Sequence, residues 1–226
     1  MKKMPLLRET IRRILHEDEV RVGSIYCDMD GVLVDFEAGA IELISEILDG
    51  TADPRWTEGS KSISRNVQRV LDSLGPDWRP SSKLDLDVKG VRQIMMSAVS
   101  SAPGKFFGSL PQLEDGVGTL WPFLNRVGVP VHVLSAPIIG REGSGATAED
   151  GKRDWCGRYL SPAPESIIIV AAVDKPNWAV TDGVPNVLVD DKRSTIDAWN
   201  ARGGIGVLHV PGDSARSIDE LRRRLG

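Results

Sequence analysis

An apolar strand that runs directly into two aspartates constrains this chain more than any other sequence feature. Residues 22–27 are mostly apolar, Asp28 and Asp30 follow them, and Gly31 lets the chain turn sharply. Ligands of open α/β sheets bind beyond the carboxyl ends of the strands. Two carboxylates this close repel each other, and burying them is costly unless a cation neutralises them. The segment therefore predicts a cation site, and magnesium is the hard ion that such oxygen ligands suit.

Four further short apolar runs predict the rest of a sheet. They lack strict alternation, which is typical of strands covered on both faces, and they occupy residues 129–134, 166–171, 186–189 and 204–209. Helical patterns occur at residues 116–126, 150–160, 194–201 and 214–225. Strands that alternate with helices favour an α/β fold, here a Rossmann-like, parallel five-stranded sheet with right-handed crossovers.

One long stretch interrupts this alternation directly after the first strand. Residues 36–110 contain no convincing strand, but helical patterns occur at residues 37–48, 62–74 and 88–100. A helical block inserted at this point predicts a small helical cap over a site. We therefore expect a core domain of residues 21–36 and 111–226, a cap of residues 37–110 and an N-terminal amphipathic helix within residues 1–20.

Composition restricts the class of protein. The chain has 226 residues, 41% hydrophobic and 27% charged, and a net charge of −4, as in ordinary soluble globular proteins. We see no basic stripe that would track a nucleic-acid backbone, and no apolar run near the ~18 residues that span a membrane. Two cysteines and no secretory signal favour the cytoplasm. We expect the N-terminal helix to pack on its own domain; the alternative is docking to a partner or, in a homodimer, to a second subunit.

Polar residues recur at the ends or starts of the other predicted elements. Asp190 and Asp191 follow one apolar strand, and Ser135 ends another. The Ser135 hydroxyl would donate to a phosphoryl oxygen, and Lys152, which opens the next helix, would offset the charge of a phosphate and of a nucleophilic aspartate. Each residue alone is explained as a turn, a helix cap or a solvated charge. Their joint occurrence in this order instead predicts one phosphate and cation site.

Four segments resemble the ordered motifs of the haloacid dehalogenase superfamily: DMDGVLVDF the first, LSAP the second, GKRDWCGRYL the third and VLVDDKRSTIDAW the acidic fourth. Within that superfamily the chain most resembles the 5'(3')-deoxyribonucleotidase family. This resemblance rests on the segments DMDGVLVDFEAG, FFGSLPQLEDGVGTLW and LVDDKRSTIDAWNARGG. It implies a magnesium-dependent phosphomonoester hydrolase in which Asp28 attacks phosphorus and forms an aspartyl-phosphate. Asp30 would protonate the leaving oxygen and then take a proton from water.

The resemblance also implies the groups that hold the metal and the phosphate. Magnesium would be bound by Asp28, the backbone carbonyl of Asp30, and Asp190 or Asp191, and the phosphate by Ser135, Ala136 and Lys152. Lys175, in DKPNW, is a rival for the role of Lys152 and is ranked second because it follows the third strand. We expect His132, inside a strand, to be a core residue and Asp35 to be structural.

The expected partner is a small phosphorylated substrate, first of all a (deoxy)nucleoside monophosphate. By resemblance, Phe36 and cap aromatics would stack on the base; Trp56 and Trp78 are candidates, although both would equally serve as the core of the cap. The alternatives are another small phosphomonoester, such as a sugar phosphate or a nucleic-acid 3'-phosphate, and a non-catalytic binding protein. A dehalogenase is disfavoured because its chemistry does not use the acid/base aspartate, and Asp30 is present.

Overall fold

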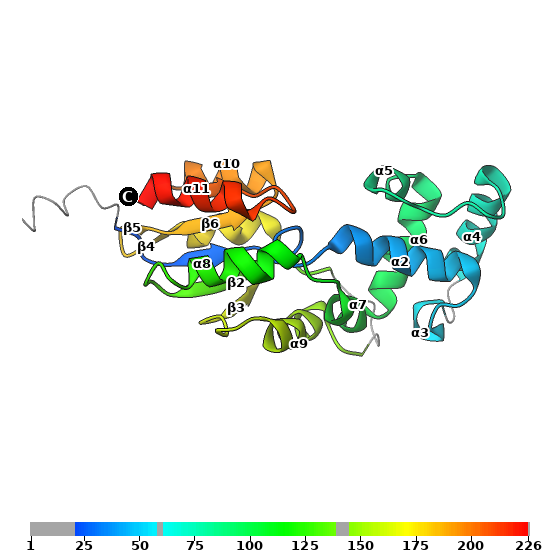
Figure 1. Cartoon of the computed structure of the whole chain (residues 1–226). Helices are drawn as coiled ribbons and strands as arrows, with labels where there is room; N and C mark the ends of the chain where they lie inside the picture. Colours follow the sequence, from blue (N-terminus) through cyan, green and yellow to red (C-terminus); the bar gives the residue numbers. More distant parts are fainter. Residues whose placement is uncertain (1–20, 58–60, 139–144, 226) are drawn as a thin grey trace, which may run out of the picture.

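The computed structural model describes residues 21–57, 61–138 and 145–225 (Figure 1), so the N-terminal helix expected within residues 1–20 lies outside the described part. The elements that form the sheet layer and its covering helices are β1 (Ile25–Cys27), η1 (Gly116–Leu120), α8 (Trp121–Leu124), β2 (Val131–Ser135), α9 (Ala148–Tyr159), β3 (Ile167–Ile169), η2 (Ala172–Trp178), β4 (Val180–Thr181), β5 (Val184–Pro185), β6 (Val187–Asp190), α10 (Arg193–Ala201), β7 (Ile205–Leu208) and α11 (Ser214–Leu225). Those between β1 and η1 are α2 (Phe36–Asp49), α3 (Pro54–Thr57), α4 (Lys61–Leu74), α5 (Lys83–Leu86), α6 (Lys89–Ser101) and α7 (Pro103–Ser109).

Five parallel strands form the main sheet in the spatial order β3–β2–β1–β6–β7, which confirms the predicted α/β fold with a five-stranded parallel sheet. Strand β1 is central, because Ile25 pairs with Val131 of β2 on one side and with Val187 of β6 on the other. The chain moves outward from β1 to β3 and then returns to the opposite side of β1. A ligand crevice opens where such a sheet reverses its strand order, which here is between β1 and β6.

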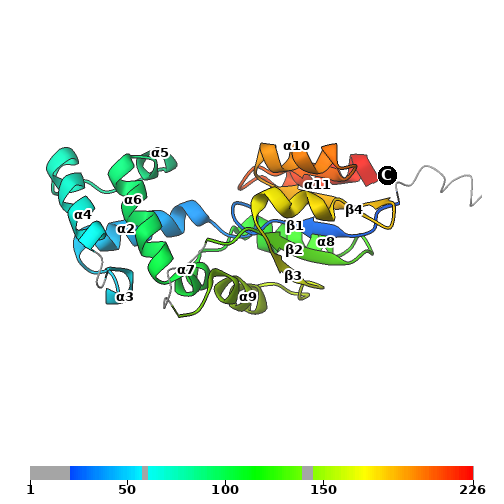
Figure 2. The same ribbon diagram turned by 180° about the vertical axis from the view of Figure 1, so that it is seen from behind.

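Helices cover both faces of this sheet. Alternate residues of a strand point to opposite faces, so Ile25 and Cys27 join the larger apolar cluster, whereas Tyr26 packs with Leu188 and Trp199 in a smaller one. Helices α8 and α11 lie on the face seen in Figure 1, and α10 and η2 lie on the face seen in Figure 2. Burial on both faces explains why the strands have no strict polar alternation.

The stretch between β1 and β2 is helical, as predicted, and α2, α4 and α6 match the expected ranges to within one residue at each end. Helix α4 packs on α6, and α2 packs on both α5 and α6. Figure 1 shows these helices gathered at one end of the molecule, beyond the carboxyl ends of the strands. We call the helices α2–α6 the cap. Its buried residues belong to the same apolar cluster as those of β1, so the core is continuous.

Two local features differ from the sequence-based expectation. The predicted helix over residues 116–126 is one π-helical turn followed by α8, because Pro122 has no N–H to continue the helical ladder. A short antiparallel hairpin, β4–β5, was not predicted. Its turn places Asp182 at φ 50° and Gly183 at φ 77°, and the Asp-Gly pair is the sequence signal for such a turn. Among the described residues, no helix is long and apolar enough to cross a bilayer.

Candidate active site

The order of the strands brings the predicted carboxylates together. Cys27 of β1 pairs with Val189 of β6, so Asp28 and Asp190 follow at adjacent positions of two neighbouring strands. The backbone N–H of Asp28 donates to the Val189 carbonyl at 2.8 Å, which fixes the end of β1 against β6. Oxygen atoms of Asp28, Asp190 and Asp191 lie within 4.8 Å of one another. The predicted convergence of two acidic strand ends is therefore present.

A buried lysine holds two of these carboxylates. The Nζ atom of Lys175 lies 2.9 Å from Asp28 Oδ1 and 2.8 Å from Asp190 Oδ2. Burial lowers the pKa of Lys175, but the two carboxylates outweigh that effect and hold the pKa above its ordinary value. Lys175 therefore stays an ammonium group. Burial and the neighbouring Asp28 raise the pKa of Asp190, and the Lys175 charge opposes this rise.

A second buried lysine holds Asp30. The Nζ atom of Lys152 donates to Asp30 Oδ2 at 2.6 Å and to Ser135 Oγ at 2.9 Å. Helix α9 brings Lys152 to this position because it packs very closely on α7. At the contact, a side chain at position 151 would overlap the carbonyl oxygen of Gly104, so only glycine fits there. Burial raises the pKa of Asp30, which the Lys152 charge only partly offsets. Asp30 Oδ1 is buried and has no hydrogen-bond partner among the described residues.

The lysine beside Asp28 is therefore Lys175, the second-ranked candidate, and not Lys152. The sequence ranks Lys152 first as the cation beside the nucleophilic aspartate, and the structure places Lys175 there instead. Ser135 and Lys152 are fully buried and do not line the cavity described below, whereas Ala136 does. The phosphate-binding role of Ser135, Ala136 and Lys152 stays a prediction. A sequence signal for Lys175 existed, because it follows β3 and so lies at the same sheet edge as Asp28.

The acidic cluster suits a divalent cation. The three carboxylates of Asp28, Asp190 and Asp191 and the Lys175 ammonium leave two uncompensated negative charges. Loss of hydration, and then repulsion from Asp28 and Asp190, raise the pKa of Asp191 to about 6. Gly31, at φ 78°, leaves room for this carboxylate, since a Cβ atom there would lie 2.5 Å from Asp191 Oδ2. An all-oxygen donor set with excess negative charge is what a hard ion such as Mg²⁺ requires.

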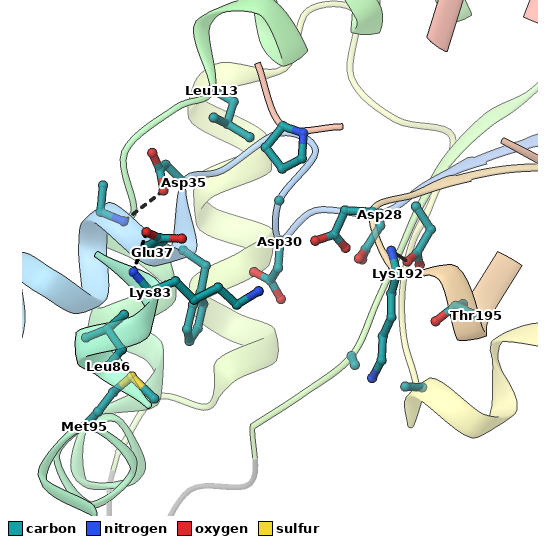
Figure 3. A pocket seen from close by; sticks show the side chains of 18 of the residues that line it. Asp28, Asp30, Asp35, Glu37, Lys83, Leu86, Met95, Leu113, Lys192 and Thr195 are labelled. Carbon is teal, nitrogen blue, oxygen red and sulfur yellow. Dashed lines mark hydrogen bonds between the residues drawn. The ribbon is translucent and has the colours of Figure 1, made fainter. Parts of the chain in front are cut away.

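A cavity of about 820 Å³ opens from the carboxylates toward the cap. Asp28 and Asp30 line its core side (Figure 3), and Lys175 also belongs to its lining. Its cap side is largely apolar but carries two cations, and the residues of that side include Phe36, Ile41, Leu86, Met95, Met96, Lys83 and Arg92. The cavity has the size of those that take a small organic ligand, well beyond a bare phosphate. Of this cap side, the sequence predicted only Phe36.

The aromatic residues named from the sequence separate into two groups. Phe36 begins α2, lines the cavity and lies edge-on to Phe106 at a centroid distance of 5.4 Å. Trp56 does not line the cavity; its ring is buried and meets Phe106 edge-on at 6.4 Å. Trp78 is partly buried against the apolar cluster and also does not line the cavity. The two tryptophans therefore contribute to packing, which was the alternative interpretation.

Two further residues behave as expected. His132 is a structural residue, because its ring stacks on Tyr26 at 4.9 Å and its Nδ1 atom shares a 2.8 Å hydrogen bond with Ser166. Asp35 caps α2, accepting a hydrogen bond from the backbone N–H of Ala38 at 2.8 Å. Asp35 therefore fixes the direction in which α2 leaves the site.

No protein-family model and no curated protein matches this sequence. The chain is similar to a solved hydrolase from Streptococcus pneumoniae TIGR4, with 10% identity over 88% of this chain and 98% of that one and a TM-score of 0.49. It is also similar to a haloacid dehalogenase-like family hydrolase from Streptococcus pneumoniae (13% identity, 88% and 90% covered, TM-score 0.44). A haloacid dehalogenase-superfamily hydrolase of subfamily IA from Geobacter sulfurreducens PCA is comparable (14% identity, 84% and 88% covered, TM-score 0.45). Likeness at this level assigns no reaction to the chain.

Proposed function

We propose that this protein is a magnesium-dependent hydrolase of small phosphomonoesters that works through an aspartyl-phosphate at Asp28. The observation that carries the proposal is the different setting of two carboxylates at the end of β1. Asp28 lies against the Lys175 ammonium, and Asp30 is only partly buried and has a raised pKa beside Lys152. Two carboxyl groups whose environments differ in this way are suited to separate roles as nucleophile and acid.

In the proposed reaction, a carboxylate oxygen of Asp28 attacks phosphorus, and the bond from phosphorus to the ester oxygen breaks. Asp30 gives its proton to the departing oxygen, which leaves as an alcohol. Water then attacks the phosphorus of the aspartyl-phosphate while Asp30 takes its proton, which frees inorganic phosphate and restores Asp28. The raised pKa of Asp30 favours the protonated form that the first step needs.

Asp28, Asp190 and Asp191, with the backbone carbonyl of Asp30 as a further predicted ligand, are the groups that would hold the magnesium ion. When bound, the ion would offset the negative charge shared by the nucleophile and the phosphate. Lys175 offsets part of the same charge from beside Asp28. Lys152 keeps Asp30 oriented and is tied to Ser135. Complete retention of these groups speaks against a non-catalytic binding protein.

For the substrate we propose a nucleotide, with a (deoxy)nucleoside monophosphate as the first candidate. The support is the cavity wall, where Phe36 contributes an aromatic ring and Ile41 and Met95 contribute apolar surface for a flat leaving group. The resemblance of the segments around Phe36 to the 5'(3')-deoxyribonucleotidase family points the same way. A sugar phosphate or a nucleic-acid 3'-phosphate is the alternative within the same chemistry.

The test is hydrolysis of 4-nitrophenyl phosphate with and without Mg²⁺ by the wild type and two variants. Asp28→Asn removes the nucleophile, so we expect turnover to fall by more than about 1,000-fold. Asp197→Asn, on the exposed side of α10, is the matched control and keeps wild-type turnover. Undiminished hydrolysis by Asp28→Asn would overturn the mechanism. With release of inorganic phosphate as the readout, a preference for sugar phosphates over nucleoside monophosphates would refute the nucleotide substrate and leave the proposed chemistry standing.

A further inference from the structure

The cap delivers a cation into the cavity that no side chain of the described residues neutralises. Lys83 begins α5, is exposed to solvent and lines the cavity, and its side chain points toward Asp30 (Figure 3). Its Nζ atom has no carboxylate within 4.0 Å among the described residues, although its backbone N–H donates to Glu37 Oε1 at 2.7 Å. That backbone contact holds the start of α5 against α2.

The acidic groups on the cap side of the cavity are already engaged. Asp35 caps α2, Glu37 accepts from the Lys83 backbone, and Asp87 lies 3.8 Å from Arg92. The deep cation Lys175 is likewise held by Asp28 and Asp190. On the cap side of the cavity, the Lys83 ammonium therefore has no ion-pair partner among the described residues, and a bound anion would neutralise it.

The position of Lys83 decides which part of a substrate it would meet. Asp30, toward which it points, is the proposed proton donor to the leaving oxygen, and Asp28 is the group proposed to meet phosphorus. Lys83 thus lies on the side of the leaving group. Phe36 and Met95 line the same side with apolar surface.

We propose that Lys83 is a specificity-determining residue that binds an anionic group carried by the leaving group of the substrate. The substrate class is then a phosphomonoester whose leaving group combines an apolar face with a carboxylate or a second phosphate. This inference rests on the proposed phosphomonoester hydrolysis and changes its first candidate substrate: among nucleotides, a nucleoside bisphosphate meets both requirements, whereas the nucleoside of a monophosphate carries no such charge.

The test compares two substrates that differ in one anionic group, phenyl phosphate and 4-carboxyphenyl phosphate. We expect Lys83→Met to lower the ratio of kcat/KM for the carboxylated to the plain ester by about 10- to 100-fold, the loss of one charged hydrogen bond. The loss should appear chiefly as a raised KM, because the contact exists before the transition state. Lys83→Arg should restore most of the ratio. Lys89→Met, at an exposed lysine of α6 outside the cavity, should leave it unchanged.

An unchanged ratio in Lys83→Met, or equal losses on both esters, would overturn the assignment; the second result would place Lys83 on the transferred phosphate. If the wild type hydrolyses neither ester with Mg²⁺, the proposed function fails. The role of Lys83 is then still decided by calorimetric binding of the two esters to wild type and Lys83→Met. Tighter binding of the carboxylated ester that depends on Lys83 supports the inference, and equal binding refutes it.

Discussion

Replacing Lys175 by Met tests the electrostatic design of the site most directly. Lys175 is 3% exposed and its partner Asp190 is 1% exposed, so the substitution leaves two carboxylates at the sheet edge without their opposing charge. Breaking a buried pair from one side costs about 3–5 kcal/mol. Methionine has a similar length, so little of this cost comes from a packing defect. We therefore expect the metal-free variant to lose about 3–5 kcal/mol of unfolding free energy.

The assay is urea unfolding at pH 7.5, with EDTA or with Mg²⁺. With a slope of about 2.5–3 kcal/mol/M, the expected loss lowers the midpoint in EDTA by about 1–2 M. Added Mg²⁺ should raise the midpoint of the variant more than that of the wild type, because three carboxylates then face the ion without a competing ammonium.

The control for this experiment is Lys192→Met, which alters a lysine of the same cavity that has no side-chain ion pair among the described residues. It should stay within about 0.5 kcal/mol of the wild type. A Lys175→Met protein within about 1 kcal/mol of the wild type in EDTA would refute the reasoning. A smaller response to Mg²⁺ than that of the wild type would refute it equally.

Two further predictions concern Asp191, a proposed metal ligand. Its pKa of about 6 in the folded chain exceeds the roughly 3.9 of an unfolded chain, so its contribution to metal-free stability is present below about pH 4 and is lost as the pH rises through 6. Because Mg²⁺ binds the ionised carboxylate, the rise in Tm that Mg²⁺ causes should become smaller below about pH 6. An equal rise in Tm at pH 7.5 and at pH 5 would contradict this prediction. Gly31→Ala should abolish most of that rise, because the new Cβ atom lies 2.5 Å from Asp191 Oδ2. The control is Gly50→Ala, at φ 72° with no atom within 4 Å, which bears the same backbone cost and should keep the wild-type rise in Tm with Mg²⁺. If Gly31→Ala and Gly50→Ala showed the same rise in Tm, the steric explanation would be refuted.

The sequence alone determined the features that are encoded locally. Apolar runs of strand length gave the five strands, and a 3.6-residue period gave α2, α4 and α6 to within one residue, because burial of a strand or of a helix face leaves its own pattern in the chain. The acidic ends of β1 and β6 were visible for the same reason. The acidic residues at these two strand ends lie close together because β1 and β6 are neighbours in the sheet.

Only the tertiary structure decided which side chains meet across the sheet edge and the cap. Lys152 lies in α9 and Lys175 in η2, directly after β3. The close packing of α9 on α7 brings Lys152 to Asp30, and the turn after β3 brings Lys175 to Asp28. Lys83 has no periodic signal, because it begins the four-residue helix α5, which is too short to show a helical period and is held against α2 by a contact of the Lys83 backbone. Such convergence depends on how distant segments are placed in space, and that information is absent from any local pattern of residues.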